Sequence, residues 1–251
     1  APLISRRKML QFSAIAAGVA AAMKAAATDA FSAEPGVKLK QGDVALFQGD
    51  SITDARRNRK TAEKPNDPGG LGDGYPVLIA GNLLRDHAKL NLKIYNRGIS
   101  GHKVPDLQKR WQKDCLDIKP ALLSILIGVN DLWHKMNGRY DGTVETYKTG
   151  FAALLKQTRM ALPDTKIVIC EPFLLRCGAV KNSWIPEFDQ RRSVAKEVAR
   201  AAGTMWVPFQ TMFDEAVASG TKPEYWAGDG VHPTLAGHAL MAQTWRSVVG
   251  V

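Results

Sequence analysis

The stretch D-V-A-L-F-Q-G-D-S-I-T-D, residues 43–54, contains an apolar run followed at once by small and acidic residues. The run 44–48 predicts a buried β-strand. Ser51 follows directly, between Asp50 and Asp54. A serine in this place is either a turn residue or a nucleophile. The second interpretation requires a base, an orienting acid and oxyanion donors elsewhere in the chain.

Strand-like and helix-like segments alternate along the rest of the chain. Short apolar runs predict further strands at 92–95, 121–127, 166–170 and 205–207. Apolar residues at helical spacing predict helices at 76–87, 104–116, 144–162, 185–202 and 233–249. This alternation, with strands that are apolar without a break, is typical of a parallel sheet covered on both faces. We therefore expect an α/β fold with a central five-stranded parallel sheet.

Small and polar residues follow the predicted strands. The turns are G-D-S at 49–51, N-R-G at 96–98 and G-V-N-D at 128–131, and G-D-G-V-H-P at 228–233 precedes the closing helix. Ligands bind at the carboxyl ends of the strands in open parallel sheets. We therefore expect these loops to share one rim of the sheet.

His232 is the best candidate for the base among five histidines, because it lies in a loop at a helix start. Asp229 lies three residues earlier, a spacing that can aim a carboxylate at the near ring nitrogen. Taken alone, D-G-V-H-P is equally compatible with a glycine turn that caps a helix. The presence of Ser51 at a strand end favours the catalytic interpretation.

Acyl transfer also needs donors aimed at the developing oxyanion. The backbone N–H groups of Ser51 and Gly98 and the side-chain amide of Asn130 are the candidates. Taken singly, Gly98 and Asn130 are also ordinary turn residues. Asp50 competes with Asp229 as the orienting acid, but it would more naturally accept from the backbone amides of its own turn.

Two further acidic residues follow strand ends. Asp54 and Asp131 are assigned supporting roles, in which their carboxylates organise the same loops. Asp50 is given the same supporting role.

The blocks G-D-S-I-T-D, N-R-G-I-S-G, I-G-V-N-D and D-G-V-H-P resemble, in this order, the four blocks of the SGNH (GDSL-type) hydrolase superfamily. The resemblance covers residues 42–250 and implies a flavodoxin-like three-layer α/β/α fold. It implies Ser51 as nucleophile and a triad completed by His232 and Asp229. It also implies Ser51, Gly98 and Asn130 as the oxyanion hole. The larger lipase fold is disfavoured because no G-x-S-x-G elbow is present.

Residues 70–76, 106–114 and 124–133 are similar to bacterial acetylxylan esterases of this superfamily. Those enzymes remove acetyl groups from xylan or xylo-oligosaccharides. The relatives carry Gly-Arg where this chain has Arg56-Arg57, so the extra cation is expected to reshape the acyl or sugar site.

Three side chains are candidate substrate contacts. Arg57 follows the first block, Trp133 follows the Asn130 loop, and Trp226 precedes the Asp229 loop. Aromatic rings stack on sugar faces, but packing in the core is an equally good interpretation for the two tryptophans.

The N-terminus predicts an export signal at 1–33, followed by one hydrolase domain at 34–251. Paired arginines at 6–7 precede a short apolar run at 12–23 and then small residues, as in a twin-arginine signal. The apolar run is too short to span a bilayer. The alternative is an amphipathic helix that stays attached. We therefore expect an exported protein, periplasmic or secreted, without stable membrane insertion.

The net charge of +10 is spread along the chain, with one dense cluster at 56–60. No nucleic-acid-binding signature accompanies it, so a solvated face is favoured and nucleic acid is not expected as a partner. The three cysteines are expected to be buried thiols, although Cys170 and Cys177 flank a short loop where a disulfide is an alternative. Neither a metal nor a cofactor is expected, and a homo-oligomer stays open.

The leading hypothesis is an esterase that releases acetate from carbohydrate through an acetyl-enzyme, so the expected partner is an acetylated carbohydrate or another small ester. A lysophospholipase or thioesterase is the alternative within the same reaction class. A non-catalytic glycan-binding module is the alternative from another class, and the presence of all four blocks speaks against it.

Overall fold

The computed structural model describes residues 36–251, so the expected export signal at 1–33 lies outside the described residues. Five strands form one parallel sheet in the order β2-β1-β3-β4-β5. They are β1 (Val44–Gly49), β2 (Lys93–Asn96), β3 (Leu122–Leu126), β4 (Lys166–Cys170) and β5 (Met205–Val207). This is the flavodoxin-like strand order. The predicted fold class is therefore confirmed.

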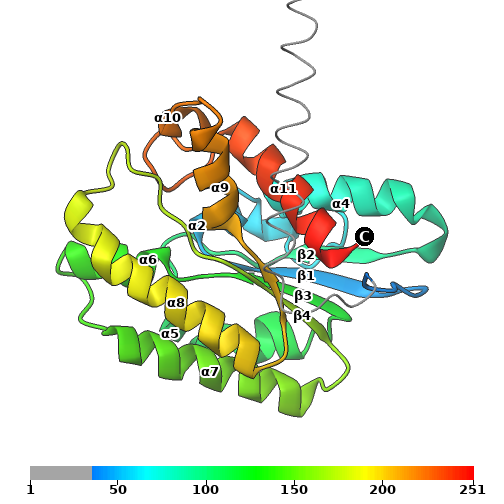
Figure 1. Cartoon of the computed structure of the whole chain (residues 1–251). Coiled ribbons are helices and arrows are strands. Elements are labelled where there is room, and N and C mark those ends of the chain that lie inside the picture. The colour runs from blue at the N-terminus through cyan, green and yellow to red at the C-terminus, as the bar shows by residue number, and fades with distance from the viewer. Residues whose placement is uncertain (1–35) are drawn as a thin grey trace, which may run out of the picture.

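Helices cover both faces of the sheet, which makes three layers (Figure 1). One face carries α4 (Tyr75–Asp86) and α11 (Leu235–Val249); the other carries α5 (Val104–Trp111), α7 (Val144–Ala161) and α8 (Ile185–Ala201). Successive strand side chains point to opposite faces. Phe47 accordingly enters the core beneath α4 and α11, and Leu46 enters the core beneath α5 and α7.

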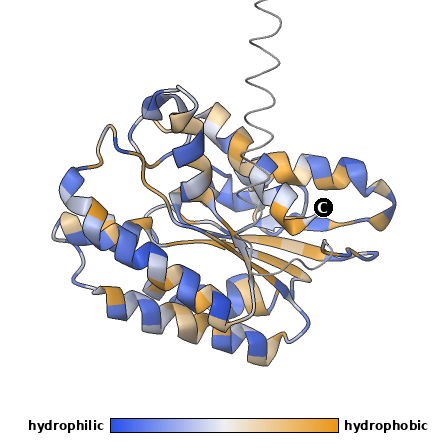
Figure 2. Cartoon of the chain, viewed as in Figure 1, coloured by the Kyte–Doolittle hydropathy of each residue, from blue (hydrophilic) through white to orange (hydrophobic). Residues whose placement is uncertain are grey.

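The strands are apolar on both faces because both faces are covered. All five residues of β3 are buried. Figure 2 shows the sheet largely in the hydrophobic colours, while the covering helices mix hydrophobic and hydrophilic residues. This is the pattern expected of helices that bury one side and expose the other.

Several helices were not expected from the sequence. They are the short α2 (Ser51–Asp54), α3 (Pro68–Leu71) and α10 (Pro223–Trp226), and the longer α6 (Val129–Met136) and α9 (Phe209–Ala218). The helix predicted at 104–116 ends at Trp111 and continues as a π-helical turn, Gln112–Leu116. The closing helix begins at Leu235 because Thr234 caps it, its hydroxyl accepting from the Gly237 N–H.

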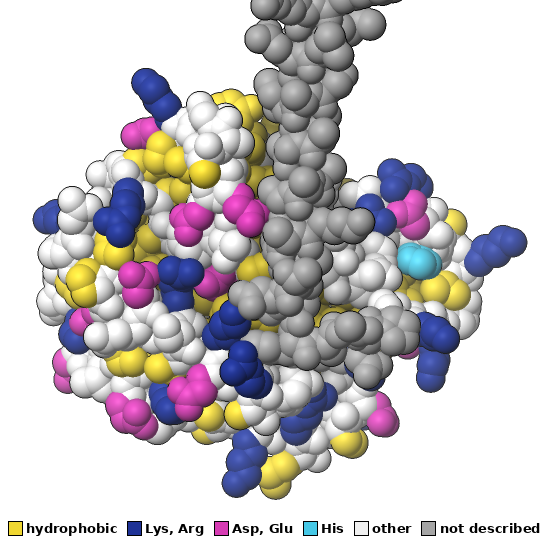
Figure 3. Space-filling view, in the orientation of Figure 1, with side chains coloured by type: hydrophobic (Ala, Val, Ile, Leu, Met, Phe, Trp, Pro, Cys, Tyr) yellow, Lys and Arg dark blue, Asp and Glu magenta, His cyan; other side chains and the backbone are white. Residues whose placement is uncertain are grey.

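All three cysteines are buried and unpaired in the described part of the chain. On the face shown in Figure 3, Lys and Arg side chains are interspersed with Asp and Glu. Within residues 36–251, no helix combines the length and the hydropathy that crossing a bilayer requires.

Candidate active site

Three of the predicted residues form one hydrogen-bonded line at the carboxyl end of the sheet. Ser51 begins α2, directly after β1, and its Oγ lies 2.8 Å from Nε2 of His232. On the other side of the ring, Nδ1 of His232 lies 2.6 Å from Oδ2 of Asp229. Ser51 and His232 are 181 residues apart in the sequence. The parallel topology therefore brings the first and last predicted loops together.

The two oxygens of Asp229 have different partners. Oδ1 accepts the backbone N–H groups of Val231 and His232 at 2.9 and 2.7 Å, which holds the turn. Oδ2 faces the ring, so the ring proton belongs on Nδ1 and Nε2 is free to accept from a hydroxyl. Burial pushes the pKa of Asp229 upward, but the hydrogen bonds from His232 and Val231 outweigh it and leave that pKa below its ordinary value.

The segment 171–184, between β4 and α8, forms backbone hydrogen bonds to the loop that carries Asp229. Leu175 N–H donates to the Gly230 carbonyl at 2.8 Å, and Ala179 N–H donates to the Asp229 carbonyl at 2.9 Å. Gly230 has φ of +83°, and a Cβ there would overlap the carbonyl oxygens of Leu175 and Cys177. Only glycine satisfies both the backbone conformation and the close approach.

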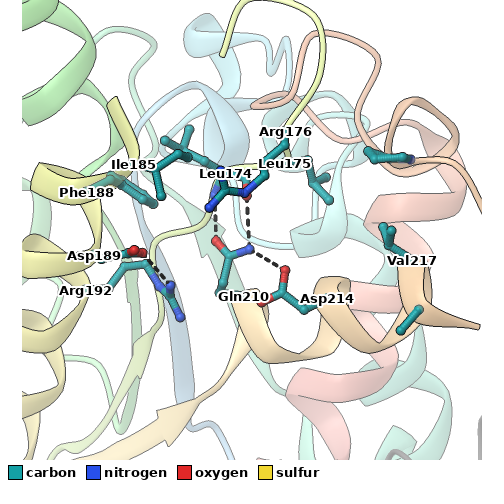
Figure 4. A pocket seen from close by; sticks show the side chains of 12 residues that line it. Leu174, Leu175, Arg176, Ile185, Phe188, Asp189, Arg192, Gln210, Asp214 and Val217 are labelled. Carbon is teal, nitrogen blue, oxygen red and sulfur yellow. Dashed lines mark hydrogen bonds and ion pairs between the residues drawn. The ribbon is translucent and has the colours of Figure 1, made fainter. Parts of the chain in front are cut away.

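Gln210, on α9, supports that segment in turn. Its side-chain oxygen accepts from Leu174 N–H, and its side-chain nitrogen donates to the Leu174 carbonyl and to Asp214 (Figure 4). These residues line a separate hollow of about 490 Å³ that shares no lining residue with the cavity beside Ser51. Gln210 thus connects α9 to segment 171–184, and that segment in turn bonds the loop that carries Asp229.

The three predicted oxyanion donors differ in the hydrogen bonds that they already make. Ser51 is the first residue of α2, where a backbone N–H has no intrahelical acceptor. Asn130 donates from Nδ2 to the His102 carbonyl at 3.2 Å, which orients its amide and leaves a second N–H. Gly98 N–H, in contrast, already donates to Oδ1 of Asn96 at 2.8 Å. An oxyanion would have to share that N–H with Asn96.

Gly98 also requires the absence of a side chain. A Cβ at this position would overlap the backbone of Thr53 and Asp54, because the second loop packs directly on α2. The close packing of these two loops places the Gly98 turn against the residues of α2 that follow Ser51.

The three supporting carboxylates each accept a backbone N–H in the loops around the site. Asp50 accepts from Ile52 N–H at 3.0 Å, so it bonds its own turn. Asp54 accepts from the N–H and the hydroxyl of Ser100, which ties α2 to the loop after β2. Asp131 accepts from Val104 N–H at 3.3 Å and so links α6 to α5. Burial is the main cause that raises the pKa of Asp50 and Asp131 to about 7.

A cavity of about 700 Å³ opens beside Ser51 and His232. Its other walls include Arg56, Asp73 and His238. This volume lies within the usual range for small-molecule sites. Nε of Arg56 donates to Oδ2 of Asp73 at 3.0 Å, and both side chains are largely exposed at the cavity. The wall therefore combines polar, charged and apolar groups.

Arg57 does not line this cavity, contrary to its prediction as a substrate contact. Its guanidinium is buried, and Nε donates to the Gly98 carbonyl at 2.8 Å. Ala55 and Arg56 have φ values of +41° and +59°, so the chain turns sharply here. Arg56, rather than Arg57, faces the cavity as a result.

The two tryptophans also lie outside the cavity lining. The Trp133 ring is 6.0 Å from the His232 ring and 5.6 Å from that of Trp184, so it packs behind the histidine. Trp226 donates from Nε1 to the Thr221 hydroxyl at 2.7 Å. Both positions favour the packing interpretation, in which Trp133 supports the His232 ring.

Two cavity residues were missed by sequence reasoning. They are Asp73 and His238, neither of which is among the predicted site residues. The only signal in the sequence is their position: Asp73 lies in the G-D-G-Y-P block, and His238 lies on the first turns of the closing helix. Among residues 36–251 no cluster of three or more His, Cys, Asp or Glu side chains is suited to hold a metal ion.

An α/β/α fold with a Ser-His-Asp line at the carboxyl end of its sheet is typical of serine hydrolases. The chain belongs to the GDSL-like lipase/acylhydrolase family, which residues 47–240 match. It is therefore a carboxylic ester hydrolase, and the predicted superfamily is confirmed.

Among its relatives, an acetylxylan esterase from Geobacillus stearothermophilus is 32% identical over 219 residues, which cover 85% of this chain and 97% of that protein. The crystal structure of that enzyme, Axe2, superposes with a TM-score of 0.76 at 31% identity and covers 86% and 97% of the two chains. Catalytic mutants of Axe2 replace a serine, an aspartate or a histidine by alanine, and these residues follow one another in that order.

Other proteins that are similar to this chain include a second solved structure and a lipoprotein. A structure from Parabacteroides merdae ATCC 43184, called a GDSL-like lipase, has a TM-score of 0.83 and 49% identity over 86% of this chain and 99% of its own. An uncharacterized lipoprotein of Bacillus subtilis strain 168 is 28% identical over 93 residues, 37% of this chain and 38% of its own.

Proposed function

We propose that this protein removes acetyl groups from carbohydrate, with acetylated xylan or xylo-oligosaccharides as the substrate class. The observation that carries the proposal is the hydrogen-bonded line from Asp229 through His232 to Ser51 at a cavity of about 700 Å³. The similarity to an acetylxylan esterase over most of both chains supports the choice of substrate.

In this proposal Ser51 Oγ attacks the acetyl carbonyl and passes its proton to Nε2 of His232. Asp229 keeps the ring in the Nδ1–H tautomer and stabilises the imidazolium that forms. The oxyanion is met by Ser51 N–H, by the free N–H of Asn130 and, in a shared bond, by Gly98 N–H. His232 then protonates the departing sugar oxygen, and a water activated by the same ring releases acetate from Ser51.

The test is acetate release from acetylated xylo-oligosaccharides, measured together with p-nitrophenyl esters of two and eight carbons. Ser51→Ala should lower kcat by as much as about 10⁶, since the nucleophile, the base and the acid act as a unit. Circular dichroism should show the same fold, because Ser51 is only half-buried at a helix start. Full activity in Ser51→Ala would refute the proposed nucleophile.

The same assays separate the alternatives. A preference for the eight-carbon ester over acetate would favour a lipid esterase or thioesterase. Binding of acetylated oligosaccharide without acetate release would favour a glycan-binding module. The ion pair of Arg56 and Asp73 at the cavity favours a polar substrate over a lipid chain.

We further propose export through a twin-arginine-type signal. The paired arginines, the apolar run and the small residues of 1–33 support it, and a partial relative is named a lipoprotein. Fractionation of cells that express the chain with Arg6 and Arg7 changed to lysine should show retention in the cytoplasm. An unchanged exported fraction would contradict this route.

A further inference from the structure

His238 is held in one orientation at the wall of the Ser51 cavity. It lies on the first turns of α11, and its Nδ1 accepts from the backbone N–H of Tyr75 at 3.1 Å. The imidazole stacks on the Tyr75 ring, with centroids 6.4 Å apart and planes 18° apart. The edge with Cε1 and Nδ1 packs closely on Gly74. These contacts fix both the ring plane and the direction of its far nitrogen.

The hydrogen bond from Tyr75 determines where the ring proton resides. A backbone N–H can only donate, so Nδ1 must present a lone pair, and the single proton of the neutral ring then resides on Nε2. Burial, followed by the positive charge of Arg56, lowers the pKa of His238 to about 4. The ring is therefore a neutral donor at neutral pH.

Within residues 36–251 the one hydrogen bond of the His238 side chain is that from Tyr75 N–H to Nδ1, so Nε2–H is left without an acceptor there. The side chain lines the same cavity as Ser51 and His232. A neutral N–H donor in this cavity is suited to bind an oxygen atom of a ligand. Without a ligand, the only acceptor for that N–H is water.

We propose that His238 is a specificity-determining residue whose Nε2–H donates a hydrogen bond to a hydroxyl or ring oxygen of the sugar that carries the ester. This inference rests on the proposed function. An acetyl group has one carbonyl oxygen, which the oxyanion donors engage, and otherwise only a methyl group. A further donor in the same cavity can therefore be met only by the alcohol part of the substrate.

The test compares two substrates that share the acetyl group. Acetylated xylobiose offers hydroxyl and ring oxygens to Nε2–H, while phenyl acetate offers only the ester itself. In His238→Asn the amide oxygen can replace Nδ1 as acceptor for Tyr75 N–H, but no donor reaches the position of Nε2. The ratio of kcat/KM for acetylated xylobiose to kcat/KM for phenyl acetate should fall about tenfold, the effect of one lost hydrogen bond.

His238→Gln is the complementary variant, since its amide nitrogen reaches the position of Nε2. It should recover part of the ratio even though Tyr75 N–H loses its acceptor. His87→Asn, at the end of α4 and away from the cavity lining, is the matched control and should keep the wild-type ratio. If the His238→Asn protein does not fold, wild-type enzyme should still prefer acetylated xylobiose about tenfold over cyclohexyl acetate, a ring without hydroxyls.

An unchanged ratio in His238→Asn, or equal wild-type rates with xylobiose and cyclohexyl esters, would overturn the inference. A different failure would concern the proposed function itself. Wild-type enzyme that hydrolyses phenyl acetate but releases no acetate from any carbohydrate would refute the sugar substrate, and this inference with it.

Discussion

At the scale of single residues, Asp229 combines two tasks that are often divided between side chains. One oxygen holds the turn through two backbone N–H groups, and the other orients the His232 ring. An amide in its place could keep the first task, because its oxygen still accepts. It would fail in the second, because an amide N–H facing Nδ1 selects the tautomer whose proton resides on Nε2.

Asp229→Asn is therefore expected to retain the fold and lower kcat by about 10⁴, as the equivalent change does in a serine protease. The measurement is kcat on p-nitrophenyl acetate, with the melting temperature as a check on folding. Asp189→Asn, at an exposed carboxylate paired with Arg192, is the control. A kcat within tenfold of wild type would contradict the role proposed for Asp229.

At the scale of elements, the turn that carries Asp229 and Gly230 is held by a segment that contains none of the proposed catalytic residues. Segment 171–184 donates two backbone hydrogen bonds to Asp229 and Gly230, and Gln210 fixes the segment from α9. The direction of the Asp229 carboxylate thus depends on the packing between the β4–α8 connection and the last loop.

Gly230→Ala tests this dependence, because a Cβ at φ +83° would overlap two carbonyl oxygens of that segment. Gly220→Ala is the matched control: its φ is +105°, but nothing lies within 4 Å of the added Cβ. Gly230→Ala should cost about 1–3 kcal/mol more unfolding free energy than the control, with a marked loss of activity. Equal stability and activity in the two variants would show that the segment does not position the turn.

At the scale of the whole molecule, the stability of the fold depends on the protonation of two buried carboxylates near the site. Asp50 follows β1, and Asp131 joins α6 to the start of α5. Burial is the main cause that raises the pKa of both groups to about 7, against an ordinary value of 3.8. Between about pH 4 and pH 7 the folded state therefore binds more protons here than the unfolded chain. Their contribution to stability is lost as pH rises through that range.

Asp131→Asn removes one of these protonation equilibria. The free energy of unfolding of the variant, relative to wild type, should increase by at most about 1.4 kcal/mol per pH unit as pH rises from about 4 to about 7. The contribution of His238 to the pH dependence of stability has the opposite sign, because its lowered pKa favours the folded state as pH rises towards about 6.5. His238 is present in both proteins, so its contribution cancels in the comparison. Denaturant titrations across this range provide the measurement, and parallel curves for the two proteins would contradict the prediction.

The sequence patterns that predicted structure correctly are those in which consecutive residues are all buried or all exposed. The run 122–126 is apolar at every position except Ser124, which indicates a strand buried on both sides, and glycine or asparagine after its end marks the rim. The loops that carry Ser51 and His232 were therefore recognisable as partners before any distance was known. The short helices α2 and α6 were not, because four to eight residues at a strand end carry too few periodic positions.

The order of residues along the chain was sufficient to predict the class of fold and the edge of the sheet at which the site lies. It was also sufficient to predict which loops carry Ser51, Asp229 and His232. Three-dimensional packing was needed to learn that Arg56 faces the cavity while Arg57 is buried, that Asn96 occupies the Gly98 N–H, and that Tyr75 orients His238. The reason is physical. Apolar periodicity depends on residues close in sequence, whereas the direction of a polar side chain depends on backbone turns and on partners that only folding brings near.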